Sequence, residues 1–184
     1  MLSLLLLSVG AAALQSEGLS VRYFAFGSNM ASSVLQGRRG LRPVLPPVGG
    51  IVRGHELRFT VPGVPFVEPS FASLERSPRA DAVCHGVLYS LTVADWLRLC
   101  ASEGVPTGYR VVTVPVERYD GGVVSAYSLT AGLLRSPVDL PPSPRYLGLL
   151  QDGAEQVGLR PEWQQKLREI ETSRFGRPRG DASA

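Results

Sequence analysis

The sequence has few of the residues that carry metal, nucleotide or nucleophile chemistry. Its 184 residues include two cysteines and two histidines, and none of these four lies in a CxxC pair or an HExxH helix, so a zinc site is not indicated. It also contains no GxSxG elbow, no GxxxxGK(S/T) loop, no dinucleotide-binding fingerprint and no Cys/His pair suited to catalysis. If the chain is an enzyme, its reaction must therefore work with a positioned substrate and one proton carrier.

A structural role without function is expected for the cysteines, for the histidine next to one of them, and for the basic residues. Cys84 in a strand-like run and Cys100 near the end of a helix-like run are expected to be small buried hydrophobes. His85 is expected to be a strand residue with a local hydrogen bond. The formal net charge is only +3, and the Arg38–Arg39 pair is expected on a solvated surface. Without a basic stripe interleaved with aromatics, nucleic-acid binding is not indicated.

The composition indicates one globular domain preceded by a separate segment. Hydrophobic residues make up 44% and charged residues 19% of the chain, which suits a single hydrophobic core. Residues 1–18 form a short apolar run, in which Ala11 and Ala13 are spaced like a signal-peptidase site. The run is too short for a membrane anchor and lacks a positive n-region, so a leader, a transit-peptide remnant and a mispredicted start all stay open. We assign the folded domain to 19–174 and expect the polar tail 175–184 to be disordered.

Hydrophobic periodicity and turn residues indicate an α+β fold with a largely antiparallel sheet and helices set against it. The region 41–77 is rich in proline and glycine, so it is expected to form loops and edge strands. The expected strands and helices are: strand 21–26, short helix 30–36 capped by Ser28 or Asn29, strand 55–61, strand 82–92, helix 93–102, strands 109–117 and 123–129 around an Asp-Gly-Gly turn, and helices 141–158 and 161–171.

The turn FGSN at 26–29 is the first candidate site. Gly27, between a strand and a helix start, lets the backbone approach a ligand, and the N–H groups that follow favour a carboxylate or a phosphate. A capped strand-to-helix turn without a ligand explains the same residues and is more common. The turn alone therefore does not establish a site.

Glu103 is the second candidate, because it ends a helix just before Gly104. The negative end of the helix dipole should destabilise an ionised carboxylate there, which would suit the group to take up a proton and later return it. A solvent-exposed glutamate without function is the alternative. Four other acids, in loops or at strand ends, are weaker candidates: Glu68, Glu75, Asp81 and Glu117.

Several segments resemble the γ-glutamylcyclotransferase family. The matching pieces are YFAFGSNM at 23–30, GVLYSLT at 86–92, SEGVPTGYRVVTVPV at 102–116, and PPSPRYLGLL at 141–150 followed by GLRPEWQQKL at 158–167. The resemblance runs from about Val21 to Ile170 and so covers nearly the whole expected domain. It implies a small mixed, largely antiparallel β-barrel with peripheral helices.

The resemblance also implies roles for individual positions. Glu103 matches the family's proton-acceptor glutamate. Seven positions match its substrate-binding residues: Tyr23, Phe24, Ala25, Phe26, Gly27, Ser28 and Tyr146. One departure is visible, since Phe26 stands where the family motif has tyrosine (YGSN). The ring and the backbone are kept there, while any hydrogen bond from the hydroxyl is lost.

The implied reaction is an intramolecular cyclisation. The free α-amine of a γ-glutamyl compound attacks its own γ-carbonyl and closes a five-membered lactam, releasing 5-oxoproline and an amine. The substrate supplies the nucleophile, so no metal or cofactor is expected. The expected partner is a small γ-glutamyl molecule, neither a nucleic acid nor a membrane, and a homodimer is compatible with the family. The resemblance implies a cytoplasmic location, and a functional leader would imply a secretory or organellar one.

The closest alternatives belong to the same superfamily. A cyclotransferase for γ-glutamylamines, or one restricted to glutathione, would share the turn and the glutamate. From a different class, a non-catalytic binding module would keep the pocket without turnover, although the intact Glu103 argues against it. A secreted or organellar protein with an unrelated amino-acid ligand is suggested only by the leader.

Overall fold

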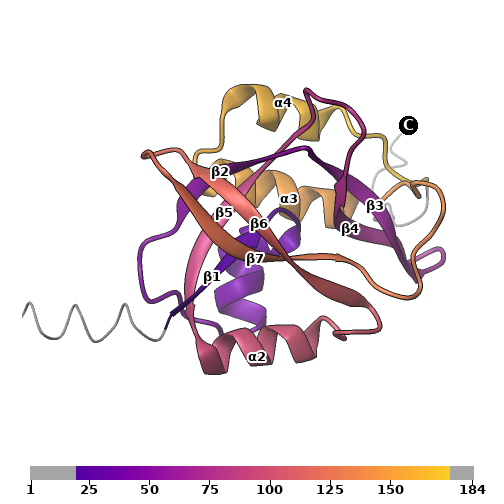
Figure 1. The fold of residues 1–184 in the computed structure, drawn as a ribbon. Helices are drawn as coiled ribbons and strands as arrows, with labels where there is room; N and C mark the ends of the chain where they lie inside the picture. The colour runs from indigo at the N-terminus through magenta and orange to yellow at the C-terminus, as the bar shows by residue number, and fades with distance from the viewer. Residues whose placement is uncertain (1–19, 175–184) are drawn as a thin grey trace, which may run out of the picture.

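The computed structural model describes residues 20–174, so the candidate leader at 1–18 and the tail at 175–184 lie outside the described residues (Figure 1). The elements in chain order are β1 (Ser20–Ala25), a 3₁₀ turn η1 (Ser28–Met30), a π-helix η2 (Ser33–Arg38), β2 (Val48–Arg53), β3 (His55–Val64), β4 (Glu68–Arg76), β5 (Val83–Thr92), α2 (Val93–Ser102), β6 (Tyr109–Arg118), β7 (Val123–Ala131), α3 (Pro144–Gln156) and α4 (Pro161–Arg168).

Five strands form a closed barrel in the order β1-β5-β2-β6-β7. Neighbours pair antiparallel, except that β7 returns to β1 through a parallel pairing of Tyr127 with Tyr23. Strands β3 and β4 form a separate two-stranded sheet, and β4 lies against β7. The α+β class expected from the sequence is confirmed.

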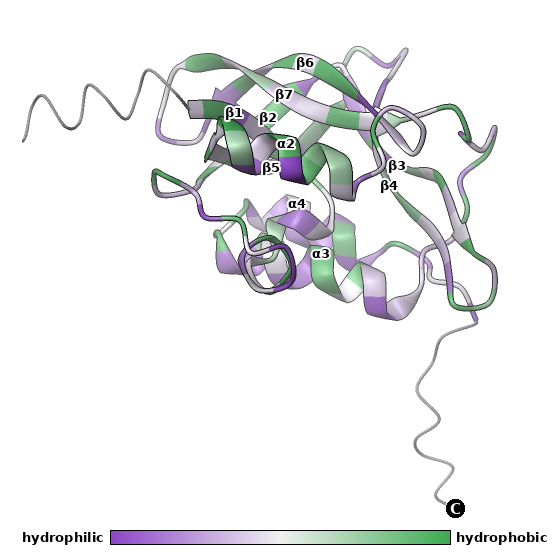
Figure 2. Cartoon of the chain, turned by 90° about the horizontal axis from the view of Figure 1, so that it is seen from below, coloured by the Kyte–Doolittle hydropathy of each residue, from purple (hydrophilic) through white to green (hydrophobic). Residues whose placement is uncertain are grey.

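The core lies inside the barrel and beneath the helices. Strand β5 pairs with both β1 and β2, and its side chains are buried on both faces, with Cys84, Val87 and Leu91 fully buried. The helices each bury one side: Figure 2 shows hydrophobic and hydrophilic stretches alternating along α2 and α3. In Figure 1, α2 lies on the opposite side of the molecule from α4. The C-terminal end of α2 lies next to the turn that follows β1.

The helix α2 begins and ends as its sequence predicts. The Thr92 hydroxyl accepts a hydrogen bond from the Asp95 N–H at 3.1 Å, which caps the first turn. The helix stops at Gly104, whose φ of +66° is a conformation that favours glycine. The strands 109–117 and 123–129, and the two C-terminal helices, are likewise confirmed as β6, β7, α3 and α4 within one to three residues.

The region 41–77 was expected to form loops and edge strands, with one strand at 55–61. It holds three strands, β2 to β4, of which β3 covers the expected strand and β2 and β4 were not predicted. Strand β2 could not be predicted from the sequence because it contains Gly49 and Gly50, which are unfavourable in strands. These are required by close packing, since a Cβ on Gly50 would lie 2.6 Å from a Val116 methyl carbon.

The expectation of one short helix after the FGSN turn is wrong. The segment forms a 3₁₀ turn and a π-helix in place of one short helix capped by Ser28 or Asn29. The two N-cap positions are Gly27 and Ser32, and neither makes a side-chain cap. The Asn29 side chain has tertiary partners instead.

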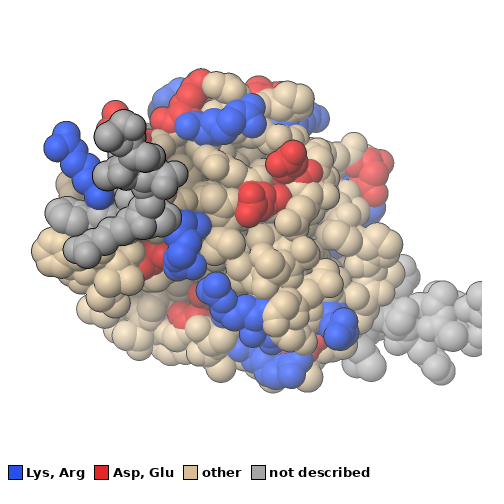
Figure 3. Space-filling view, turned by 180° about the vertical axis from the view of Figure 1, so that it is seen from behind, with Lys and Arg blue, Asp and Glu red and all other residues tan. Residues whose placement is uncertain are grey.

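The charged residues of the described range are dispersed. Arginine and lysine side chains alternate with acidic ones in scattered groups on the face drawn in Figure 3. Several pair across the surface, as in Arg53–Glu117 and Arg58–Asp139, both at 2.6 Å. Within residues 20–174, no helix has the length and apolar character needed to cross a membrane.

Candidate active site

A cavity of about 360 Å³ lies where the end of β1, η1 and η2 meet the end of α2, the start of β6, strand β4 and helix α3. This volume is within the range of small-molecule pockets. Six of the eight residues proposed from the sequence line the cavity: Tyr23, Phe26, Gly27, Ser28, Glu103 and Tyr146. The tertiary structure thus brings the two candidate sites of the sequence into one place.

Glu103 is held at the mouth of this cavity by the way α2 ends. Its backbone N–H donates to the Leu99 carbonyl at 3.0 Å, and the next turn closes with Val105 N–H donating to the Cys100 carbonyl at 3.1 Å. Its side chain is only 13% exposed. The alternative of a solvated helix-end glutamate is therefore wrong.

Two side chains, Arg39 and Asn29, form a closed ring of hydrogen bonds with the Glu103 carboxylate. Arg39 Nη2 and Asn29 Nδ2 both donate to Oε1, at 2.6 and 2.7 Å. Arg39 Nε donates to Asn29 Oδ1 at 2.8 Å, which closes the ring. The set is anchored on two sides, because Asn29 Nδ2 also donates to the Tyr23 hydroxyl at 3.0 Å and Arg39 Nη1 donates to the Ser102 hydroxyl.

These contacts change the electrostatic argument made from the sequence. The helix end and partial burial act against an ionised carboxylate. The Arg39 cation and the Asn29 amide act in its favour, since both donate to the charged oxygen. The side chain that the sequence placed on a solvated surface, Arg39, is 18% exposed and belongs to the site.

Tyr146 also lines the cavity. Its hydroxyl accepts a hydrogen bond from the Ala72 N–H at 3.1 Å and also contacts the hydroxyl and backbone N–H of Ser28. Burial, with a further contribution from the Glu103 charge, raises the pKa of Tyr146 to about 12. The phenol therefore stays neutral near pH 7 and can act in the site as a hydrogen-bonding group.

Two further tyrosines are neutral for the same reason. Burial, reinforced by the negative charge of Glu103, raises the pKa of Tyr23 far above its ordinary value. Burial also raises the pKa of Tyr109, whose hydroxyl donates to the Ala72 carbonyl at 3.0 Å. Among the cavity-lining residues of the described range, Glu103 is the one carboxylate.

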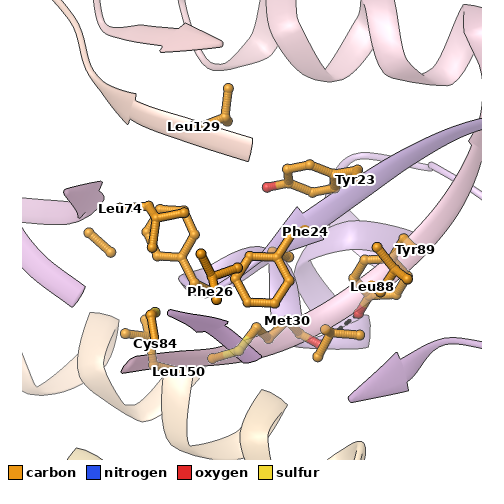
Figure 4. Packing of buried hydrophobic residues seen from close by; sticks show 14 of the residues in the cluster. Tyr23, Phe24, Phe26, Met30, Leu74, Cys84, Leu88, Tyr89, Leu129 and Leu150 are labelled. Atoms are coloured by element: carbon orange, nitrogen blue, oxygen red, sulfur yellow. Dashed lines mark hydrogen bonds between the residues drawn. The ribbon is translucent and has the colours of Figure 1, made fainter. Parts of the chain in front are cut away.

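Phe24 and Ala25 are not brought into the cavity. Successive side chains of β1 point to opposite faces, so Tyr23 faces the site while Phe24 enters the core. Figure 4 shows the Phe24 ring on the other side of β1 from the Tyr23 ring. Both Phe24 and Ala25 are fully buried, and their contribution to the site is the position of the strand.

Three polar residues that matter to the site are among the cavity residues that the sequence reasoning did not propose. Asn29 was taken as a helix cap, Arg39 as a surface charge and Tyr109 as an ordinary strand residue. Asn29 lies inside the FGSN motif, so the motif could have pointed to it. Arg39 gave no local signal, because its partner Glu103 is 64 residues away in the chain.

The remaining cysteine and histidine expectations are confirmed in part: Cys84 is buried and His85 lies in a strand, but Cys100 is only partly buried and the hydrogen-bond partner of His85 is not local. Cys84 is a buried free thiol and Cys100 a partly buried one. His85 Nδ1 lies 2.6 Å from the Tyr119 hydroxyl, and its ring stacks on Trp163 at 5.0 Å. No group of three or more His, Cys, Asp or Glu side chains within 20–174 is placed to hold a metal ion.

Comparison with known proteins decides the family. The sequence model of the AIG2-like family matches residues 83–167. A gamma-glutamyl cyclotransferase, verK from Clonostachys rogersoniana, is 32% identical over 152 residues, covering 70% of this chain and 84% of that protein. The chain belongs to the γ-glutamylcyclotransferase family. The matched range runs from β5 to α4 and includes Glu103 and Tyr146.

Two further comparisons show how much of the chain and of its relatives the similarity covers. Gamma-glutamyl cyclotransferase gliK from Aspergillus fumigatus is 35% identical over 170 residues, covering 80% of this chain and 61% of that protein. The chain thus spans less than two thirds of the length of this relative. A solved structure of a gamma-glutamyl cyclotransferase superposes with a TM-score of 0.74 at 25% identity, covering 89% of this chain and 94% of the other. The γ-glutamylcyclotransferase fold is therefore present across the domain.

Proposed function

We propose that this γ-glutamylcyclotransferase family member converts γ-glutamyl amino acids or peptides into 5-oxoproline and the free amino acid or peptide. The observation that carries the proposal is the position of Glu103. A nearly buried carboxylate lies on a cavity whose other walls are the FGSN turn and Tyr146. No second carboxylate and no thiol lines the described part of this cavity. A reaction whose nucleophile is part of the substrate suits such a site.

The proposed chemistry needs one group that takes up a proton and returns it. Glu103 accepts a proton from the α-ammonium of the substrate, which frees the nitrogen lone pair. That nitrogen attacks the γ-carbonyl carbon and closes the lactam, and Glu103 passes its proton to the leaving nitrogen as the bond to the leaving amine breaks. The ring nitrogen then gives up its second proton, through Glu103, to the released amine, which leaves as an ammonium group while Glu103 returns to the carboxylate. Holding the chain curled for this attack is worth on the order of 7 kcal/mol or more.

The walls of the cavity supply the remaining contacts. The backbone N–H groups of Gly27 and Ser28 are the donors proposed for the α-carboxylate or for the oxyanion that forms at the γ-carbon. A larger residue at Gly27 would crowd the cavity wall, since a Cβ there would lie 3.2 Å from the Ala72 Cβ and 3.3 Å from the Tyr146 hydroxyl. Phe26 contributes a ring without a hydroxyl, so this part of the contact is apolar.

One observation favours amino-acid or peptide leaving groups over amines. Arg38 and Arg145 line the same cavity as Glu103, and both are exposed side chains. Arg145 donates with one nitrogen to Glu68, while Arg38 has no side-chain partner among the described residues. Two guanidinium groups at the opening attract a leaving group that carries a carboxylate and repel one that carries an ammonium group.

The test is to measure 5-oxoproline release from γ-glutamyl dipeptides, glutathione and γ-glutamyl-lysine. We expect turnover by the native protein and a loss of at least about 10²-fold in kcat for Glu103→Gln. The matched control is Glu117→Gln, which changes an exposed carboxylate on β6 that pairs with Arg53. Near-native activity of Glu103→Gln would contradict the mechanism. Binding of these compounds without any turnover would instead favour a non-catalytic binding module.

A further inference from the structure

The two oxygens of the Glu103 carboxylate have different surroundings. Oε1 accepts two hydrogen bonds, from Arg39 Nη2 and Asn29 Nδ2. Oε2 accepts none from any residue within 20–174. The structure therefore separates an oxygen that is held from an oxygen that is available.

The groups that hold Oε1 are themselves held. Asn29 is 6% exposed, and both ends of its amide are engaged, by Tyr23 and Glu103 on the nitrogen and by Arg39 on the oxygen. Arg39 uses three of its nitrogens on three different partners: Asn29, Ser102 and Glu103. Neither side chain can turn away from the carboxylate without breaking several hydrogen bonds.

We propose that Arg39, together with Asn29, is a positioning residue that holds Glu103 by Oε1, and that Oε2 is the atom that carries the proton. This inference rests on the proposed cyclisation. A proton acceptor must lie within hydrogen-bonding distance of the group that loses the proton. With Oε1 occupied, Oε2 keeps its lone pairs for the substrate ammonium, and the same atom returns the proton to the leaving nitrogen.

The pairing also keeps the acceptor in place. The Arg39 and Glu103 side chains are 18% and 13% exposed, so the charge of either one would be poorly solvated without the other. Two fixed donors on one oxygen also set the rotation of the carboxylate. A misplacement of about 1 Å at a reacting group can cost on the order of 10²-fold in rate.

The experiment measures kcat and KM separately for 5-oxoproline release by Arg39→Gln, Arg39→Lys and Arg39→Ala. We expect kcat to fall on the order of 10²-fold in Arg39→Gln, with KM changed far less, because the proton transfer occurs after binding. Lysine keeps the charge but cannot donate to three partners in the same geometry, so Arg39→Lys should retain an intermediate kcat. Guanidinium ion at a non-denaturing concentration should restore part of kcat to Arg39→Ala.

The matched control is Arg53→Gln, which breaks an ion pair of the same 2.6 Å length outside the cavity and should leave kcat unchanged. A structural role alone would lower the melting temperature of Arg39→Ala without rescue by guanidinium, and would overturn the inference. A loss confined to KM would also overturn it, by showing that Arg39 binds the substrate directly. Native-like kcat in Arg39→Gln would refute the inference alone, whereas a native protein that turns over none of the substrates would refute the proposed function.

Discussion

The hydroxyl of Tyr146, on helix α3, accepts a hydrogen bond from the backbone N–H of Ala72, on strand β4, at 3.1 Å. This contact joins the C-terminal helices to the β3–β4 sheet, and both residues line the same cavity as Glu103. The arrangement predicts that the substrate pocket and the stability of the domain depend on the same phenol.

We therefore expect Tyr146→Phe to lower the free energy of unfolding by about 1–3 kcal/mol, because a buried N–H loses its acceptor. Urea denaturation monitored by fluorescence measures this change. Tyr127→Phe is the matched control, since Tyr127 is half-exposed and packs on Trp96 through its ring. A Tyr146→Phe variant as stable as the control would show that Ala72 finds another acceptor.

The turn that ends α2 should tolerate only glycine. Gly104 has a φ of +66°, so Gly104→Ala is expected to cost about 1 kcal/mol of stability and to lower kcat by displacing Glu103. Gly148→Ala, inside α3 with nothing within 4 Å of the new Cβ, should instead stabilise by about 0.5–1 kcal/mol. Thermal melting and initial rates of both variants test this; equal effects of the two substitutions would contradict it.

Stability should fall in acid through His85. Burial, with the nearby charge of Arg160, lowers the pKa of His85 to about 4 from the usual 6.5. The unfolded chain therefore takes up the proton first as the pH falls, so this contribution is complete above pH 6.5 and is lost as the pH falls toward about 4. We expect this part of the pH dependence to be absent in His85→Gln. Denaturation midpoints between pH 4 and pH 7 that decline equally in both proteins would assign the effect to other groups.

Asn29 and Arg39 should act as one unit. Each donates to Glu103 Oε1 and they also bond to each other, so Asn29→Ala combined with Arg39→Gln should lose less kcat than the two single losses multiplied together. A double-mutant cycle on kcat measures the coupling. Strict additivity would mean that the two side chains hold the carboxylate independently.

The charged opening of the cavity should act on the leaving group. We expect Arg38→Gln to raise KM for a γ-glutamyl dipeptide with a free carboxylate, and to raise it much less for the same dipeptide with an amidated C-terminus. The native preference for the free carboxylate should weaken with added salt, because exposed charges are screened. Equal KM changes for both substrates would remove Arg38 from leaving-group recognition.

Much of this fold could be predicted from short stretches of sequence, because several helices and strands begin or end at residues that favour a cap or a turn. The helix α2 has a capping hydroxyl at Thr92 and a glycine stop at Gly104 in the sequence itself. The strands β6 and β7 are joined by residues that favour a turn. Strand β2 could not be predicted in this way, because its glycines make sense only against Tyr119 and Val116, which lie far along the chain.

The site was predictable only in part. Resemblance to a family pointed to Glu103, Tyr146 and the turn after β1, and the structure places them on one cavity. It also named Phe24 and Ala25, which are fully buried and do not line the cavity. The arginine that faces the carboxylate, Arg39, belongs to a pair of basic residues that was expected on a solvated surface.

By itself, the sequence determined the α+β class, the ends of α2 and the two segments in which chemistry could occur, because caps, glycines and periodicity act over a few residues. Only the tertiary structure decided what Glu103 touches. Its partners Asn29 and Arg39 are 74 and 64 residues away, and the contact exists because the turn after β1 and the end of α2 are packed against each other. The surroundings of a carboxylate are a property of that packing, and no spacing along the chain encodes them.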